Sequence, residues 1–317
     1  MSACVTVRAP ARLHLGFLDL HGGLGRRFGS IGLAIDEPAT RLSIARADAD
    51  EATGPDASRV AAHLSALKRR HGLDGAYKVT VEAAIPDHVG LGSGTQLALA
   101  LGAALRALEG LPGDLSDDAL LLQRTGRSGI GAAVFAMGGV VVDGGRGERT
   151  KTPPVLARLP FPPDWRIILV LDPCLKGVHG PQEAESFAAL PPFAEAASGE
   201  ICRLTLIQAL PALVEEDIGE FGAAIARIQE IVGGYFAPAQ GGGAFTSARV
   251  GAALRGFASL GATGIGQSSW GPTGFCFARS GEEADRMRRL MSDEANAFGV
   301  DITVCNGVNH GALVTGA

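Results

Sequence analysis

Residues 85–96 read Ile-Pro-Asp-His-Val-Gly-Leu-Gly-Ser-Gly-Thr-Gln, and an apolar segment follows at once as far as Gly110. Glycine at positions 90, 92 and 94 lets the backbone take positive φ values and approach a ligand closely. Leucines then recur every three or four residues, which is the spacing of one helix face (Leu97, Leu101, Leu105 and Leu108). The stretch is therefore predicted to be a glycine loop that opens onto a helix.

Such a junction is typical of an anion site. The first N–H groups of a helix have no partner within the helix, and the helix dipole favours negative charge there. A plain tight turn before a buried helix is the alternative, but it needs no polar side chains, and this loop carries three. We therefore predict that phosphate binds to Gly90, Gly92, Ser93, Gly94, Thr95 and Gln96.

Composition narrows the class of protein. The chain has 317 residues, of which 46 % are hydrophobic and 19 % charged, enough for a core and about two domains. A net charge of −5 with no basic run longer than residues 68–70 argues against nucleic-acid binding. Five scattered cysteines, no basic-then-apolar leader and no long apolar run predict a reduced, cytoplasmic protein. Histidine spacing gives no zinc motif.

Charged residues also lie within a glycine-rich stretch near the start of the chain. Arg12, Asp19, Arg26 and Arg27 sit among apolar residues and glycines. One interpretation is a glycine-rich hairpin with exposed arginines. The other is that an arginine contacts an anionic ligand, because guanidinium matches phosphate and carboxylate geometry. Asp19 would then hold a metal or orient an arginine.

Five prolines between Thr150 and Asp164 mark a candidate domain boundary, which divides the chain into residues 1–155 and 156–317. A buried strand is predicted just after it, over Arg166 to Asp172. The loop beyond that strand carries Lys176 and His179, and loops at strand ends commonly carry function. A solvated loop histidine is the alternative for His179.

A third glycine-rich stretch starts at Gly264, ahead of a predicted strand. It holds four residues that we interpret as substrate-binding: Gln267, Ser268, Ser269 and Trp270. The tryptophan would either stack on an aromatic substrate or pack on a neighbouring domain. The second half of the chain reads as strand, three helices, strand, helix and two strands, which predicts an α+β layer.

Three of these stretches resemble the motifs of the GHMP superfamily of small-molecule kinases. They are Arg8-Ala-Pro-Ala-Arg12, Pro86-x-x-x-Gly90-Leu-Gly-Ser93 and Gly264-Ile-Gly-Gln-Ser-Ser269. The resemblance spans essentially the whole chain. It implies an α+β fold with an N-terminal domain like ribosomal protein S5, a C-terminal ferredoxin-like domain and a site in the cleft between them.

The chain departs from the kinases where they carry an aspartate as catalytic base. The matching run is Ser128-Gly-Ile-Gly131-Ala-Ala, and glycine cannot accept a proton. The runs Gly-Leu-Gly-Ser-Gly-Thr-Gln, Lys-Gly-Val-His-Gly and Gly-Gln-Ser-Ser-Trp-Gly-Pro are instead similar to the β-ribofuranosylaminobenzene 5′-phosphate synthases, a non-kinase branch of the superfamily.

That resemblance implies a decarboxylating phosphoribosyl transferase of tetrahydromethanopterin biosynthesis. It would condense phosphoribosyl pyrophosphate with 4-aminobenzoate or 4-hydroxybenzoate, release CO₂ and pyrophosphate, use Mg²⁺ and act as a homodimer. On this hypothesis the catalytic residues are Arg12, Asp19, Lys176 and His179, and Arg26 joins the loop in binding phosphate. Metal ligands are left unassigned. An ATP-dependent GHMP kinase and a non-catalytic ligand-binding descendant are the two alternatives.

Overall fold

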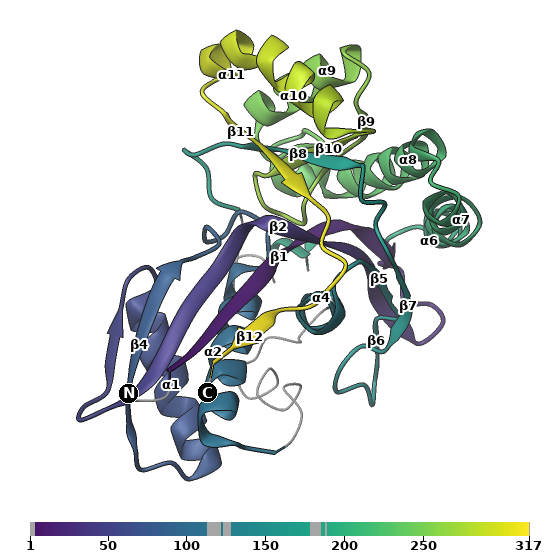
Figure 1. The fold of residues 1–317 in the computed structure, drawn as a ribbon. Helices are drawn as coiled ribbons and strands as arrows, with labels where there is room; N and C mark the ends of the chain where they lie inside the picture. The colour runs from purple at the N-terminus through teal and green to yellow at the C-terminus, as the bar shows by residue number, and fades with distance from the viewer. Residues whose placement is uncertain (1–3, 113–121, 123–127, 178–184, 188, 317) are drawn as a thin grey trace.

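The computed structural model describes residues 4–112, 122, 128–177, 185–187 and 189–316, and these form two sheets with helices packed on them (Figure 1). Within this described part the first sheet has eight strands: β1 (Cys4–Asp19), β2 (Arg26–Ala47), β3 (Glu51–Thr53), β4 (Ala76–Ala83), β5 (Val140–Asp143), β6 (Arg146–Gly147), β7 (Val155–Leu159) and β12 (Leu313–Thr315). The second sheet has four: β8 (Arg166–Leu171), β9 (Thr263–Gln267), β10 (Gly274–Ala278) and β11 (Asp301–Asn306), in the order β11-β8-β10-β9.

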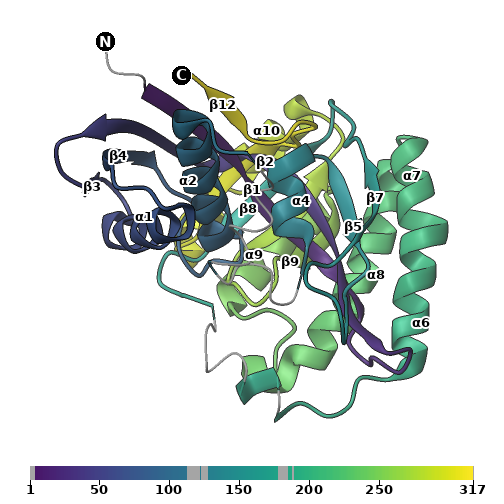
Figure 2. The same cartoon turned by 90° about the horizontal axis from the view of Figure 1, so that it is seen from below.

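Three helices belong to the first half of the chain and lie over the first sheet in Figure 2: α1 (Ala57–His71), α2 (Ser93–Glu109) and α4 (Ile130–Met137). The second half supplies α6 (Glu195–Leu204), a π-helical turn (Thr205–Ala209), α7 (Leu210–Val214), α8 (Ile218–Phe236), a 3₁₀ turn (Ala237–Gln240), α9 (Ala248–Ser259), α10 (Gly281–Leu290) and α11 (Ser292–Phe298). None of the helices in the described ranges is both long and apolar enough to cross a membrane.

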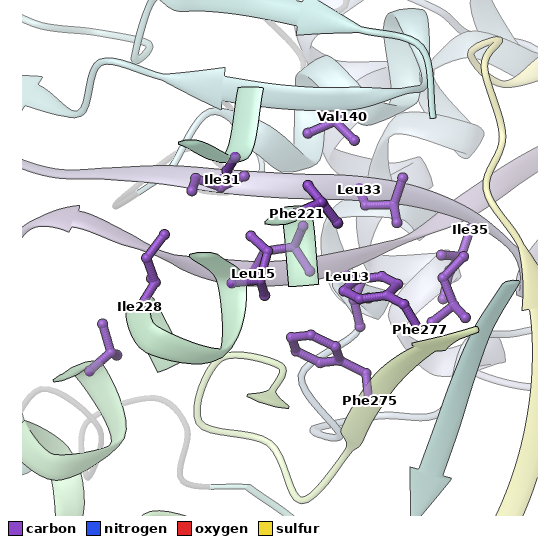
Figure 3. Close-up of a cluster of buried hydrophobic side chains, with 14 of the residues drawn as sticks. Leu13, Leu15, Ile31, Leu33, Ile35, Val140, Phe221, Ile228, Phe275 and Phe277 are labelled. Atoms are coloured by element: carbon purple, nitrogen blue, oxygen red, sulfur yellow. The ribbon is translucent and has the colours of Figure 1, made fainter. Parts of the chain in front are cut away.

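The long hairpin of β1 and β2 contributes to two separate hydrophobic clusters. Near its open end, Val5 and Val7 pack with the leucines of α1 and α2. Further along, Leu13 and Leu15 pack with Phe221 of α8 and with the second sheet (Figure 3). Each fully buried side chain of this kind contributes about 1.5–3 kcal/mol. The hairpin therefore joins the cores of both halves of the molecule.

The two central strands of the second sheet, β8 and β10, are buried on both faces, which explains their nearly continuous apolar sequences. In β10, Phe275 and Phe277 point to the cluster shared with β1, whereas Cys276 and Ala278 pack with α9 and α10. Successive side chains of a strand face opposite sides, so such a strand needs cover on each side. The α+β two-domain fold predicted from the sequence is confirmed by this arrangement.

The chain after β11 returns to the first sheet, as the yellow ribbon in Figure 1 shows. β12 pairs antiparallel with β1, with Val314 opposite Val7. On the way, the N–H of Val308 donates to the carbonyl of Ala34 at 2.9 Å. β7, which begins at the predicted boundary after residue 155, also pairs with β5 of the first sheet. The division into residues 1–155 and 156–317 stays a prediction.

Two elements owe their form to irregular or glycine-rich sequence. The first strand continues to Asp19 because β-bulges after Pro10 and His14 absorb the irregular pattern. The glycine-rich stretch from Gly264 is not simply a lead into a strand, since Thr263–Gln267 itself forms β9 beside β10. Its glycines fit there because Cβ atoms at positions 264 and 266 would meet the rings of Phe277 and Phe275.

Candidate active site

The loop of residues 86–92 delivers the N-terminus of α2 to the wall of a cavity of about 510 Å³. Gly90 and Gly92 have φ values of 87° and 79°, so both take the left-handed conformation that favours glycine. The N–H groups of Thr95 and Gln96 bond back to the carbonyl of Gly92, each at 3.1 Å. This geometry places Ser93, at the start of the helix, on the cavity wall, where the helix end favours an anion.

Both halves of the chain line the cavity. Arg12 of β1, Arg59 of α1 and the glycine loop come from the first half, and Gly177, Trp270 and Gly271 come from the second half. The predicted phosphate-binding residues Gly90, Gly92, Ser93, Gly94 and Thr95 all lie in this lining, as does the predicted substrate-binding residue Ser269.

Three loops meet at the cavity through backbone contacts that only glycine allows. A Cβ atom at Gly90 would lie 2.1 Å from the carbonyl oxygen of Ser268. One at Gly271 would lie 2.1 Å from the carbonyl of Val89, and one at Gly177 would lie 2.5 Å from the carbonyl oxygen of Trp270. Backbone cannot yield as a flexible side chain does. The three glycines therefore form a close junction between the second half of the chain and residues 86–92, which we call the phosphate loop after its predicted ligand.

Hydrogen bonds fix the same junction. The N–H of Gly177 donates to the carbonyl of His88 at 2.7 Å. The hydroxyl of Ser268 donates to the carbonyl of Gly90 at 2.7 Å and accepts the N–H of His14 at 2.9 Å. Arg12 donates from Nη1 to the carbonyl of Gly90 at 3.1 Å. Ser268 thus connects β1 to the phosphate loop from a buried position.

A carboxylate and a guanidinium also line the cavity. Asp87 accepts a hydrogen bond from the hydroxyl of Ser93 at 3.0 Å and forms an ion pair with Arg59. Burial by itself raises the pKa of Asp87, but the hydrogen bonds from Arg59 and Ser93 outweigh it and bring the pKa below its ordinary value. Asp87 is therefore ionised at neutral pH, and its carboxylate is bonded to Ser93 and Arg59.

Gly131, the position where the resemblance to the kinases leads us to expect an aspartate, lies beside Thr95 and Gln96 of α2. A Cβ atom at this position would lie 3.1 Å from Cγ2 of Thr95. The side chain of Gln96 donates to the carbonyl of Gly131 at 2.9 Å, which holds α4 against α2. Position 131 is therefore next to the predicted anion site, and no titratable side chain projects from it.

The turn before Gly131 is organised by a buried carboxylate at the end of β5. Asp143 accepts the hydroxyl of Ser128 at 2.9 Å and the N–H groups of Gly129 and Gly145 at 3.0 and 2.8 Å. Burial raises the pKa of Asp143, and these hydrogen bonds oppose that shift. Asp143 therefore positions α4 beside α2 from outside the cavity lining.

Trp270 closes one side of the cavity as part of an aromatic cluster. Its indole is 3 % exposed and stacks on Phe187 with ring centroids 4.9 Å apart and planes 15° apart. The ring of Phe236 meets it edge-on at 4.8 Å. Trp270 therefore packs against segments of its own chain as well as facing the cavity.

The other predicted site residues lie in several places. Lys176 is exposed beside Gly177, and His179 falls outside the described residues. Asp19 lies at the far end of β1, where its carboxylate accepts the N–H groups of His21 and Gly22 at 2.7 and 2.9 Å. Arg26 donates to two backbone carbonyls after β5. The structure thus places Asp19 at the end of β1 and Arg26 at the start of β2, apart from the residues that line the cavity.

Gln96 and Gln267 do not line the cavity, but their side chains make hydrogen bonds that hold neighbouring segments in place. Gln267 is buried, and its side chain accepts the N–H of Thr246 at 2.6 Å and donates to Gln240 at 2.8 Å. Sequence reasoning did not identify Arg59, Asp87, His88, Gly177 or Gly271 as site residues. Asp87 and His88 could have been identified from their position inside the glycine loop itself. Arg59 could not, because it reaches the cavity only through the packing of α1.

Family models match both halves of the chain. The model for the N-terminal domain of GHMP kinases matches residues 58–139, and the model for their C-terminal region matches residues 209–297. The β-ribofuranosylphenol 5′-phosphate synthase of Archaeoglobus fulgidus is 37 % identical over 302 residues, which cover 90 % of this chain and 91 % of that protein. The synthase of the same name from Methanothermobacter thermautotrophicus is 29 % identical, covering 97 % and 98 %.

Solved structures share the fold at low sequence identity. Homoserine kinase from Cytophaga hutchinsonii superposes with a TM-score of 0.67 at 17 % identity, covering 98 % of this chain and 97 % of that one. Mevalonate diphosphate decarboxylase from Staphylococcus aureus gives a TM-score of 0.67 at 16 % identity, covering 99 % and 98 %.

Proposed function

The chain belongs to the GHMP superfamily and, within it, to the β-ribofuranosylphenol 5′-phosphate synthases, and from this premise we propose that it joins ribose 5-phosphate to an aromatic ring. The proposed substrates are phosphoribosyl pyrophosphate and a 4-substituted benzoate. Because the relatives are named for a phenol product, 4-hydroxybenzoate is the favoured acceptor, with 4-aminobenzoate as the alternative.

The proposed reaction proceeds without a strong base. The bond between ribose C1 and the pyrophosphate oxygen breaks, and its electron pair leaves with pyrophosphate. The ring carbon that bears the carboxylate forms the new bond to C1. The bond to the carboxylate then breaks, CO₂ leaves, and the electron pair restores the aromatic ring. This sequence needs positioning and stabilisation of the departing charge.

The observation that carries the proposal is a cavity at the N-terminus of α2, beside a position 131 that holds glycine. A kinase that transfers phosphate to an alcohol needs a base within reach of that hydroxyl. Among the described lining residues the one carboxylate is Asp87. Burial raises its pKa, but the hydrogen bonds from Arg59 and Ser93 bring the pKa below its ordinary value, so Asp87 is a weak base. The imidazole of His88 also lines the cavity. The curated relatives, which are named as synthases, favour the synthase over the kinase.

In the proposed complex, pyrophosphate binds at the N-terminus of α2, near Ser93, Thr95 and Arg12. Mg²⁺ commonly binds through substrate phosphates and one or two protein oxygens. Asp87 and Ser93 offer such oxygens in the lining and would hold the ion, which would help to neutralise the departing pyrophosphate. Among the described residues no cluster of three metal-binding side chains exists. A homodimer, a cytoplasmic location and a place in tetrahydromethanopterin biosynthesis stay predictions.

The test is to incubate the purified protein with phosphoribosyl pyrophosphate, Mg²⁺ and carboxyl-labelled 4-hydroxybenzoate or 4-aminobenzoate. We expect CO₂ and pyrophosphate to be released in equal amounts. In Ser93→Ala the KM for phosphoribosyl pyrophosphate should rise about tenfold, because a hydrogen bond to a charged group is lost. Ser259→Ala, on α9 outside the cavity lining, is the matched control. Absence of CO₂ release with either benzoate, together with ATP-dependent phosphorylation of an alcohol, would overturn the proposal.

A further inference from the structure

A small recess lies next to the cavity, between β1 and residues of the second half of the chain. Its volume is about 20 Å³, and its lining includes His14, Phe17, Gln229, Phe236 and Ser269. Ser269 lines both the recess and the cavity, so the two spaces are neighbours. A space of this size holds one water molecule or one group of similar size, and it is too small for an aromatic ring.

The recess is polar but carries no lysine, arginine, aspartate or glutamate among its described lining residues. The amides in its wall are already bonded to protein. Gln229 donates to the carbonyl of Leu15 at 2.8 Å and accepts the N–H of Gln267 at 2.8 Å. Gln267 in turn donates to Gln240 and to the carbonyl of Ser269. These bonds fix the amides of Gln229 and Gln267. Among the described residues that line the recess, Nε2 of His14 is then the one fully buried side-chain nitrogen or oxygen without a hydrogen-bond partner.

His14 is 3 % exposed, and its Nε2 is buried without a hydrogen-bond partner. A buried polar atom of this kind is uncommon in a native protein and calls for an explanation. The strand β1 has a bulge between His14 and Gly16, a feature that re-aims side chains beside active sites. Phe17 packs against the imidazole at a centroid distance of 4.5 Å. Burial, followed by the nearby charge of Arg12, lowers the pKa of His14 well below its ordinary value, so the ring is neutral.

The chemistry of the two spaces suits the two ends of one molecule. The cavity carries the guanidinium groups of Arg12 and Arg59, which suit a carboxylate and phosphates. The recess offers a neutral, unpaired buried nitrogen in an uncharged wall, which suits a hydroxyl or amino group. Trp270 lines the cavity, Phe236 lines the recess, and their rings meet edge to face at 4.8 Å. A 4-substituted benzoate has this polarity, with a charged end and a neutral polar end separated by a ring.

We propose that the recess receives the 4-hydroxyl or 4-amino group of the aromatic acceptor and that Nε2 of His14 makes the hydrogen bond that selects it. The inference rests on the proposed function, since it assigns a subsite to that reaction's acceptor. His14 is then a specificity-determining residue. An acceptor without a hydrogen-bonding group at this position leaves Nε2 unpaired, and its binding is weaker for that reason.

The experiment measures binding of 4-hydroxybenzoate and of 4-methylbenzoate to the full-length protein by calorimetry, without phosphoribosyl pyrophosphate. The methyl compound has similar size and cannot form the hydrogen bond. We expect the wild-type protein to prefer the hydroxyl compound about tenfold or more. In His14→Leu the preference should fall below about threefold, and in His14→Gln, whose amide can replace the bond, part of it should return.

Ser30→Ala is the matched control, because Ser30 is also buried with an unpartnered side-chain oxygen but lines neither space. It should leave the preference unchanged. A wild-type protein that binds both compounds equally, or neither, overturns the inference without any variant. So does a His14→Leu protein that keeps the full preference.

Steady-state kinetics distinguish a failure of this inference from a failure of the proposed function. In His14→Leu the KM for 4-hydroxybenzoate should rise about tenfold, while the KM for phosphoribosyl pyrophosphate changes less than twofold. If the KM of both substrates rises equally, His14 has only a structural role and the inference fails. If the wild-type protein shows the binding preference but releases no CO₂, the proposed function fails and the subsite stands.

Discussion

An alanine at position 271 would place a methyl group 2.1 Å from the carbonyl carbon and oxygen of Val89 and 2.4 Å from the amide nitrogen of Gly90. Ordinary van der Waals contact begins near 3.4 Å, so the loop of residues 268–271 and the phosphate loop would have to separate by about 1.3 Å. Neither side can relieve the clash by rotating a side chain, because the atoms in contact are backbone.

The magnitude follows from that separation. Overpacking of this kind costs about 1–3 kcal/mol of the free energy of unfolding, since the contacts of one junction are lost and the rest of the fold is kept. Activity should suffer more. A displacement of about 1 Å in a substrate-positioning segment costs on the order of 100-fold in rate. Gly271→Ala is therefore expected to retain its fold and lose about 99 % of the CO₂ release.

The assay compares Gly271→Ala with Gly243→Ala, a loop glycine whose nearest contact for a Cβ atom is 3.4 Å, and measures kcat/KM and urea unfolding for both. Gly243→Ala should match the wild type in both measurements. If Gly271→Ala keeps full activity, the close approach of the two loops does not matter for the reaction. If it loses activity only in proportion to its unfolded fraction, the junction is structural alone.

Three further predictions concern neighbouring residues. Gly131→Asp should fold, because the side chain of Thr95 can move away from the new Cβ. Its carboxylate should repel pyrophosphate and raise the KM for phosphoribosyl pyrophosphate about tenfold or more, without producing kinase activity. Gly131→Ala, assayed as the control, should change this KM little. Asp143→Ala should lower the free energy of unfolding in urea by about 3–5 kcal/mol, because it leaves buried donors unpaired; a loss below about 1 kcal/mol would contradict the importance of this network. The third uses His14, whose lowered pKa means that the unfolded chain binds a proton below about pH 6.5 that the folded chain does not. Stability is therefore full above that pH and declines below it by up to about 1.4 kcal/mol per pH unit, and His14→Gln, measured by urea unfolding from pH 8 to 5, should flatten the decline.

Much of the site could be predicted from the sequence because its parts are local. The alternation of glycine with Ser93 and Thr95 before an apolar helix describes an anion loop by itself. The absence of an acid at position 131 is equally visible. These signals depend only on residues that are adjacent in the chain, and the confirmed GHMP fold brings them together.

The rest depends on contacts between distant segments. Arg59 lies on a helix whose pattern predicts only an amphipathic surface, and it reaches the cavity because α1 packs beside Asp87. Asp19 illustrates the opposite case. In sequence an aspartate among arginines suggests chemistry, whereas in the structure its carboxylate binds the N–H groups of its own turn. Packing between distant segments decides between such alternatives, and a single sequence does not reveal that packing.

The pairing of β12 with β1 has a consequence for the chain as it is synthesised. Residues 6–8 leave the ribosome early, but their partners at residues 313–315 follow only after some 300 more residues, which takes about 15–60 s at ordinary rates of translation. During that interval β1 presents an unpaired edge, and such edges promote association between nascent chains. We expect chains stopped before residue 306 to bind chaperones or aggregate, and synthesis through residue 315 to relieve this.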